Sequence, residues 1–131
     1  LLIMRKLITT IFLILPFFSG IAQSPENLGK AINSAFAERM PIISPDGKTL
    51  FFARKYHPNN FGKEDNDDIW VSNLLADGSW SKPFNMGAPL NNREHNFVVT
   101  VSPSGNVLYL ANDYGGGRKD AISISKKEGR T

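Results

Sequence analysis

The chain has 131 residues, 15 basic and 12 acidic side chains, a formal net charge of +3 and no cysteine. The absence of cysteine excludes a disulfide framework and any thiolate metal site. The charges are nearly balanced and scattered, so they form no basic patch of the kind that binds nucleic acid or an anionic membrane. The length is sufficient for one small core.

The first 22 residues predict a secretory signal peptide. A basic start leads into an apolar run of twelve residues at 7–18, and Gly20 and Ala22 place small residues before a cleavage site ahead of Gln23. A membrane anchor is the alternative, but twelve helical residues span only about 18 Å of a hydrocarbon core of about 30 Å. We expect three extra residues before the initiator Met4, and neither a lipid anchor nor a membrane-spanning segment after cleavage. Cleavage removes two basic residues and leaves 13 against 12 acidic ones, which gives no reason to expect nucleic acid as a partner.

Residues 27–53 repeat at residues 85–111, at a constant offset of 58 and without a gap. Eight of the 27 aligned pairs are identical, where ordinary residue usage gives about one or two by chance. One supersecondary unit is therefore used twice, and such a unit buries its apolar face only against a neighbour. We expect residues 23–84 to form a first repeat and residues 85–131 a second, truncated one. The identical pairs are Asn27/Asn85, Gly29/Gly87, Asn33/Asn91, Ser44/Ser102, Pro45/Pro103, Gly47/Gly105, Leu50/Leu108 and Ala53/Ala111.

Both copies show the same order of strand and turn signals. Short runs rich in aromatic and branched residues, bounded by Pro and Gly, are typical of strands. In the turns at residues 45–48 and 103–106, proline presets φ at the first corner, and Gly47 or Gly105 accepts a positive φ. The expected strands are residues 40–44, 49–54 and 68–72 in the first copy and residues 97–102, 107–112 and 120–125 in the second.

A fourth strand is expected after the turn at Gly78, at residues 79–80, with a counterpart at residues 128–131. Four short antiparallel strands that recur every ~40–60 residues describe a β-propeller blade, and a closed propeller needs about four to eight of them. The sequence therefore predicts an all-β fold with nearly two four-stranded blades, as the N-terminal fragment of a larger propeller. Two blades alone leave an uncovered apolar face on each side.

Three segments of the first copy, residues 43–52, 68–72 and 77–83, resemble the "Pro-Asp" repeat. This is a WD40-like β-propeller repeat of TolB-like proteins and of exported Bacteroidetes proteins of the OmpA family. Residues 85–91 resemble its inter-blade link, so the resemblance covers nearly the whole mature chain. The repeat residues expected to be structural are Ser44, Pro45, Asp46, Gly47, Asp68, Trp70, Gly78, Trp80, Ser102, Pro103, Gly105 and Asp120.

The second copy departs from the repeat at Ser104, where Asp is usual, and at 121–122, where an Ile-aromatic pair is common. Asp68 and Asp120 are expected to be counterparts at the start of the third strand. The resemblance implies blades that bind envelope proteins or peptidoglycan-associated partners in the periplasm, at the outer membrane or outside the cell. It also implies a following OmpA-like domain that holds peptidoglycan.

No catalytic, cofactor or metal site is expected. The acidic run at 64–68 offers oxygen ligands for Ca²⁺, but it lacks the spacing of a calcium loop, which favours a solvated loop. His57 and His95 have no ligand spacing and are expected on the surface or in loops. The glycine run at 115–117 lacks the spacing of a phosphate loop. The aromatic residues at recurring strand positions are expected in the core or between blades; they are Phe51, Phe52, Trp70, Trp80 and Tyr109.

Two enzymatic alternatives stay open. Residues 125–131 resemble the Asp-box of sialidases, although Lys127 stands where the box has its Asp. A serine peptidase of the prolyl-oligopeptidase type would carry such a propeller ahead of a catalytic domain with a G-x-S-x-G motif. No nucleophile–base pair, metal-ligand cluster or phosphate loop is recognisable in the sequence, which favours a binding or scaffold module over both enzymes.

Overall fold

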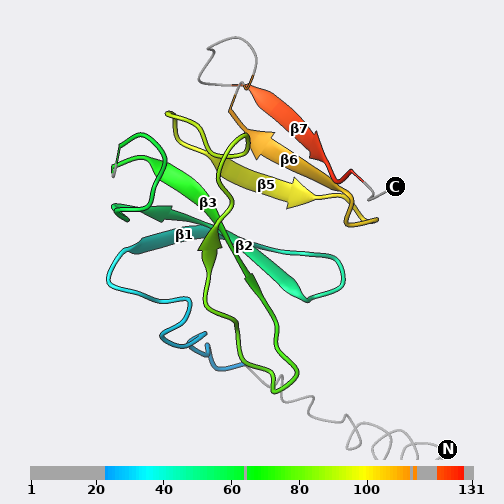
Figure 1. Ribbon diagram of the computed structural model, residues 1–131. Helices are drawn as coiled ribbons and strands as arrows, with labels where there is room; N and C mark the ends of the chain where they lie inside the picture. The colour runs from blue at the N-terminus through cyan, green and yellow to red at the C-terminus, as the bar shows by residue number, and fades with distance from the viewer. Residues whose placement is uncertain (1–22, 64, 113, 115–120, 129–131) are drawn as a thin grey trace, which may run out of the picture.

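The computed structural model describes residues 23–63, 65–112, 114 and 121–128 (Figure 1). The predicted signal peptide, the glycine run at 115–117, Asp120 and residues 129–131 lie outside the described residues. The described part contains seven strands and no helix. The prediction of an all-β fold is therefore confirmed.

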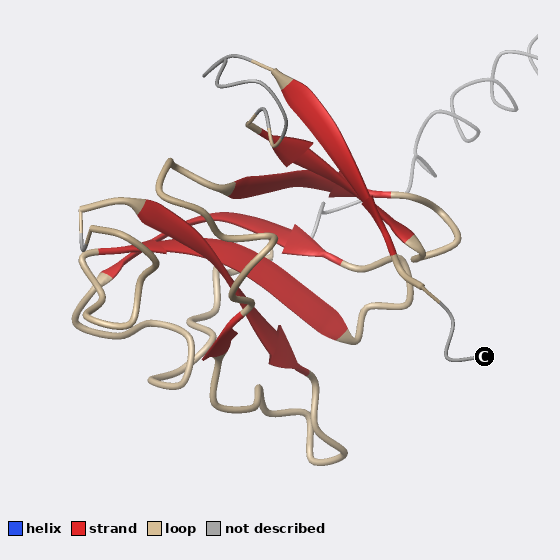
Figure 2. Ribbon diagram, turned by 45° about the horizontal axis from the view of Figure 1, so that its top comes forward, coloured by secondary structure: helices blue, strands red, loops and turns tan. Residues whose placement is uncertain are grey.

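The strands form two separate antiparallel sheets, one from each copy of the repeat, and the sheets pack against each other (Figure 2). The first sheet has the order β1-β2-β3-β4 and the second the order β5-β6-β7. The first three strands of each copy lie where the sequence predicted them, within three residues at either end. The strands are β1 (Ala37–Ile43), β2 (Thr49–Lys55), β3 (Asp67–Asn73), β4 (Phe84–Asn85), β5 (Phe97–Val101), β6 (Val107–Ala111) and β7 (Ile122–Lys126).

The two sheets share the same strand register. Ile42 pairs with Phe51 in the first sheet, and Thr100 pairs with Tyr109 in the second, at the offset of 58 found in the sequence. In both copies the first strand carries a one-residue bulge immediately before this pair. A bulge bends the strand and increases its twist. The repeat found in the sequence is therefore also present in the structure.

The fourth strand of the first sheet differs from the prediction. Residues 79–80 form no strand, because Trp80 makes only an isolated bridge with Leu74. The strand β4 follows later, where Phe84 pairs with Val71. Between these two contacts Ser81 bonds to Asn73 through both its backbone N–H and its hydroxyl, and Pro83 has no N–H to donate to a ladder. The counterpart expected at residues 128–131 lies mostly outside the described residues.

The register of the third strands shows that Asp68 and Asp120 are not counterparts in the two copies. Arg54 pairs with Asp68, and at the equivalent place in the second copy Asn112 donates its backbone N–H to the carbonyl of Ala121, 3.0 Å away. Ala121 is therefore the counterpart of Asp68, and the assignment of Asp120 to that position is wrong. The loops before the third strands differ in length between the copies, so the sequence alone did not fix this register.

The main core lies between the sheets. Phe51, Ile69 and Val71 of the first sheet are buried against Val98 and Leu110 of the second. Alternation along each strand directs these residues to a single face. The apolar contact between the two copies therefore supplies the burial that neither sheet has alone.

A second apolar cluster covers the opposite face of the first sheet. Leu50, Phe52 and Trp70 are buried there together with Ile32, which lies in the segment before β1, and Trp80 packs against them. Four of the five aromatic residues predicted for core or inter-sheet packing therefore lie in the two clusters. Tyr109, the fifth, is exposed, because nothing among the described residues covers its face of the second sheet.

Candidate functional site

The turn between β1 and β2 is built by three of the predicted motif residues. The Ser44 hydroxyl donates to Asp46 Oδ1 over 2.5 Å and accepts the backbone N–H of Thr49 over 2.9 Å. Gly47 follows with φ +72°, as predicted for this position. The hydrogen bonds from Ser44 and from the N–H of Lys48 lower the pKa of the Asp46 carboxyl from its ordinary value.

The turn between β5 and β6 has the same bonds with a hydroxyl in place of the carboxylate. Ser102 Oγ lies 3.1 Å from Ser104 Oγ and accepts the N–H of Val107 over 3.1 Å. Gly105 has φ +74°. Ser104 therefore takes the place of Asp46 in the turn but contributes no charge.

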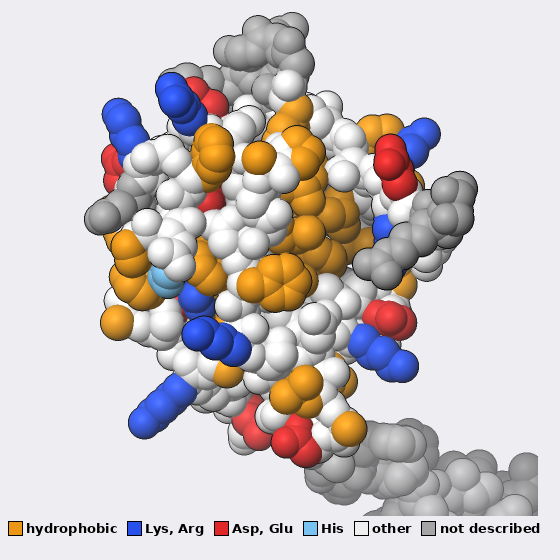
Figure 3. Space-filling view, in the orientation of Figure 1, with side chains coloured by type: hydrophobic (Ala, Val, Ile, Leu, Met, Phe, Trp, Pro, Cys, Tyr) orange, Lys and Arg blue, Asp and Glu red, His pale blue; other side chains and the backbone are white. Residues whose placement is uncertain are grey.

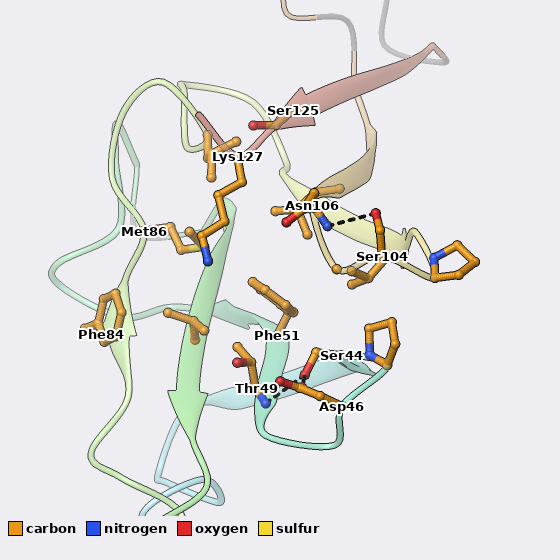
Figure 4. A pocket seen from close by; sticks show the side chains of 17 residues that line it. Ser44, Asp46, Thr49, Phe51, Phe84, Met86, Ser104, Asn106, Ser125 and Lys127 are labelled. Carbon is orange, nitrogen blue, oxygen red and sulfur yellow. Dashed lines mark hydrogen bonds between the residues drawn. The ribbon is translucent and has the colours of Figure 1, made fainter. Parts of the chain in front are cut away.

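These two turns border a groove of about 470 Å³ that opens between the sheets. Apolar side chains gather over this region in the middle of one face of the molecule (Figure 3). Lys127 extends over the groove from the second sheet, while Asp46 lies on the side of the first sheet (Figure 4). The apolar side chains that line the groove are Phe51, Val71, Phe84, Met86, Leu90, Val101 and Leu108.

The groove is lined mainly by apolar side chains, with a few polar groups at its edge. Its titratable groups are Asp46 and Lys127, and its hydroxyls belong to serines and a threonine with no histidine among the lining residues. The Ser44 hydroxyl donates to Asp46, which itself lies within a turn. An apolar floor with a few polar groups at its edge fits the apolar side chains of a bound segment.

The link between the sheets repeats a hydrogen-bonded loop found before the first sheet. Asn85 Oδ1 accepts the N–H of Gly87 and the side-chain amide of Asn91, both over 2.7 Å. The N–H of Asn91 donates to the carbonyl of Gly87 over 2.8 Å. The same three bonds join the counterparts, which are Asn27, Gly29 and Asn33.

Asn91 also clamps the link onto the first sheet. Its Oδ1 accepts the N–H of Ile69 over 2.8 Å, and its Nδ2 donates to the Ile69 carbonyl over 3.0 Å. Asn91 is fully buried, so these bonds satisfy backbone groups that water does not reach. Asn33 and Asn91 are one of the identical pairs of the repeat, but the sequence analysis predicted no role for them. Their identity in the two copies was the one sign in the sequence that they contribute to the structure.

Asp68 lies outside the groove and has a structural role. Its Oδ2 accepts the N–H of Phe61 over 2.7 Å and the amide of Asn85 over 2.6 Å. Its Oδ1 is buried with no hydrogen-bond partner among the described residues. Burial raises the pKa of this carboxyl above its ordinary value.

The remaining motif residues of the first sheet also lie away from the groove. Trp70 stacks beneath the guanidinium of Arg54, with 4.6 Å from Cζ to the ring centroid. Gly78 occupies a turn with φ +83°, beside Asp77 and the isolated bridge of Trp80. The structure thus brings together the turn residues of the two copies and leaves Asp68, Trp70, Gly78 and Trp80 elsewhere.

Apart from Asp68, which was expected at the start of the third strand, the acidic run was expected to be a solvated loop, and for Asp67 this is wrong. Asp67 is buried in β3 beside Asp68. Asp67 lies 3.3 Å from Arg39 Nε and 2.7 Å from His95 Nδ1, so it joins the first sheet to the link. His57 packs between the rings of Phe36 and Trp70. Within the described ranges, no group of three or more His, Asp or Glu side chains is arranged to hold a metal ion.

Comparison with known proteins returned no match to a family model, a curated protein or a solved structure. None of the described segments forms an apolar helix long enough to cross a membrane.

Proposed function

We propose that this chain is an exported β-propeller scaffold of the cell envelope, which binds a protein or another envelope component through the groove between its repeats. In this proposal the two sheets are successive blades of the Pro-Asp type, and the chain is the N-terminal part of an OmpA-like protein. The partner lies in the periplasm, at the outer membrane or outside the cell. The binding step needs no cofactor and no turnover.

One observation carries the proposal. The turns that repeat in the sequence lie side by side in space and border a groove with an apolar floor. Phe84 is a large apolar side chain at this groove and remains more than half exposed. An exposed aromatic beside an apolar hollow is typical of a surface that a partner covers.

The experiment compares two exposed phenylalanines. Phe84 lines the groove, whereas Phe61 is similarly exposed but belongs to the loop before β3 and does not line it. Phe84→Ser and Phe61→Ser chains, purified after export, are incubated with envelope extracts and, separately, with isolated peptidoglycan. We expect the wild type and Phe61→Ser to retain the same envelope component and Phe84→Ser to lose most of it.

Two results would contradict the proposal. Equal retention by Phe84→Ser and Phe61→Ser would show that the groove is not the binding site. Hydrolysis of a sialoside or a peptide, abolished by a substitution within residues 23–128, would favour an enzyme over a scaffold.

A further inference from the structure

The two sides of the groove carry charges of opposite sign. Asp46 belongs to the turn of the first sheet, Lys127 follows β7 of the second, and both line the groove (Figure 4). The two charges do not neutralise each other, because no ion pair within the described residues includes either of them. The groove therefore has an acidic side and a basic side above its apolar floor.

This polarity comes from two differences between the copies. In the turn of the second copy, Ser104 takes the place of Asp46. After the third strand of the second copy, Lys127 takes the place of Leu74. The backbone N–H of Leu74 and that of Lys127 each donate over 2.8 Å to the carbonyl of the residue that follows the turn glycine, which identifies them as counterparts. Both differences make the second side of the groove less acidic than the first.

The turn holds the Asp46 carboxylate in place and leaves one of its oxygens available. Oδ1 accepts the Ser44 hydroxyl and the N–H of Lys48, the latter over 3.0 Å. Oδ2 accepts no hydrogen bond within the part of the chain that the structure describes. The carboxyl is exposed and its pKa is lowered by these bonds, so it is ionised at neutral pH. An incoming cationic group therefore meets an oriented acceptor.

We propose that the groove binds a segment of a partner protein that directs a basic side chain to Asp46, an acidic side chain to Lys127 and apolar side chains to the floor between them. A peptide is the occupant because one chain presents all three kinds of side chain. An anionic glycan or lipid surface would be repelled by Asp46 and would leave the apolar floor uncovered. The inference rests on the proposed function, because it names the partner of the same groove.

The charges and the floor should contribute differently to binding. Apolar burial supplies most of the affinity of such a site, while charges at its edge select among partners. A single solvent-exposed ion pair changes affinity by at most about fivefold. Substitutions of the two charged residues should therefore change which peptides are bound more than how tightly the chain binds.

Selection from a phage-displayed library of random peptides on the immobilised chain, purified after export, tests the basic side. We expect the retained peptides to carry a basic and an acidic residue separated by apolar residues. With Lys127→Glu, a basic residue should replace the acidic one. Lys126→Glu is the matched control, because Lys126 is also exposed but does not line the groove, and it should leave the selection unchanged.

The acidic side is tested with Asp46→Asn, which keeps Oδ1 for the turn and removes the charge. The retained peptides should lose their preference for a basic residue. A peptide selected on the wild type should bind this variant up to about fivefold more weakly by fluorescence anisotropy. Asp77→Asn is the control, because Asp77 accepts the N–H and hydroxyl of Ser79 in a similar turn away from the groove.

Phe84→Ser separates this inference from the proposed function. It should lose peptides of every charge pattern, whereas the charge variants should only change the selection. A wild type that retains no peptide, or a selection unchanged by both Lys127→Glu and Asp46→Asn, would overturn the inference. The proposed function would still stand if Phe61→Ser retained the envelope component and Phe84→Ser lost it. Equal retention of that component by these two variants would instead contradict the proposed function itself.

Discussion

Each sheet has a hydrogen-bonded cluster of polar side chains at three equivalent positions. The cluster contains an ion pair in the first sheet and only neutral amides in the second. In the first sheet, Glu38 accepts the N–H of Ser34 and the Nε of Arg54, the latter over 2.9 Å. In the second sheet, Asn96 accepts the N–H of Asn92 over 2.7 Å, and Asn112 donates to the side chain of Asn92 over 3.3 Å. The equivalent positions are Ser34/Asn92, Glu38/Asn96 and Arg54/Asn112.

The difference shows that the repeat preserves positions rather than residue types. Arg54 is almost fully buried, donates to the carbonyl of Ile32 and lies over the rings of Phe52 and Trp70. Asparagine amides occupy all three equivalent places of the second sheet and carry no charge. The stability of the first sheet should therefore depend on the Arg54–Glu38 ion pair and on the cation–π contacts of Arg54. The second sheet has no such pair at the equivalent positions.

Replacing Arg54 should have the largest effect. Arg54→Met leaves the carboxylate of Glu38 without its ion partner in a largely buried place, which costs about 3–5 kcal/mol. Asn112→Leu, the equivalent change in the second sheet, removes neutral hydrogen bonds and should cost about 1–2 kcal/mol. Urea unfolding followed by tryptophan and tyrosine fluorescence measures both. Similar losses in the two variants would contradict the comparison.

The turn glycines should be equivalent in both copies. Gly47 and Gly105 have nearly the same positive φ, and a Cβ at either position meets no atom within 4 Å. Gly47→Val and Gly105→Val should each cost on the order of 1–2 kcal/mol, because a β-branched residue is strained at that φ and nothing else changes. Asn59→Ala, in an exposed loop, is the control and should change the unfolding midpoint little. A large difference between the two glycine variants would show that the turns are not equivalent.

Asp68 should give the first sheet a pH dependence that the second lacks, because its counterpart is Ala121. Burial raises the pKa of Asp68, so the folded state binds a proton more readily than the unfolded state. Its stabilising contribution is therefore complete at acidic pH and is lost as the pH rises through the raised pKa. Asp68→Asn keeps an acceptor for Phe61 and should gain stability relative to the wild type between pH 4 and neutral pH. A difference independent of pH would contradict this account.

His57 should have the smallest effect, with the opposite sign. Burial, and then the nearby charge of Arg54, lower the pKa of His57, so the unfolded state binds the proton more readily. The contribution of His57 is therefore present above the ordinary histidine pKa and is lost as the pH falls through the lowered value. His57→Phe keeps a ring between Phe36 and Trp70 and should flatten the loss of stability below neutral pH. An unchanged slope in urea unfolding across that range would exclude this role.

Most of the strand pattern was predictable because each strand is a short apolar run between turn residues. Ser44 and Gly47 identified the first turn, and their identity with Ser102 and Gly105 identified the second. The edge strand β4 was not predictable, because its position depends on side-chain bonds of Ser81 to Asn73. The register of β7 could not be predicted, because the loops before the third strands differ in length and the constant offset of the repeat does not extend across them.

The candidate groove could be predicted only in part. The turn residues that border it were recognised, but their approach in space follows from how the second sheet packs on the first. The hydrogen bonds of Asn91 to Ile69 could not be predicted either, because the sequence does not indicate which backbone groups a polar side chain in a loop will contact after folding. Counting identities showed that Asn33 and Asn91 matter without showing that only Asn91 is buried.

The same substitution at these two asparagines is the most direct test of the repeat packing. Asn91→Leu keeps the size of the side chain but leaves the buried N–H and carbonyl of Ile69 without this clamp, at a cost of about 2–4 kcal/mol. Asn33→Leu, measured by urea unfolding at concentrations where the chain is monomeric, should change stability by about 0.5 kcal/mol or less, because Asn33 is exposed. Equal losses at the two positions, or no loss at Asn91, would contradict the account.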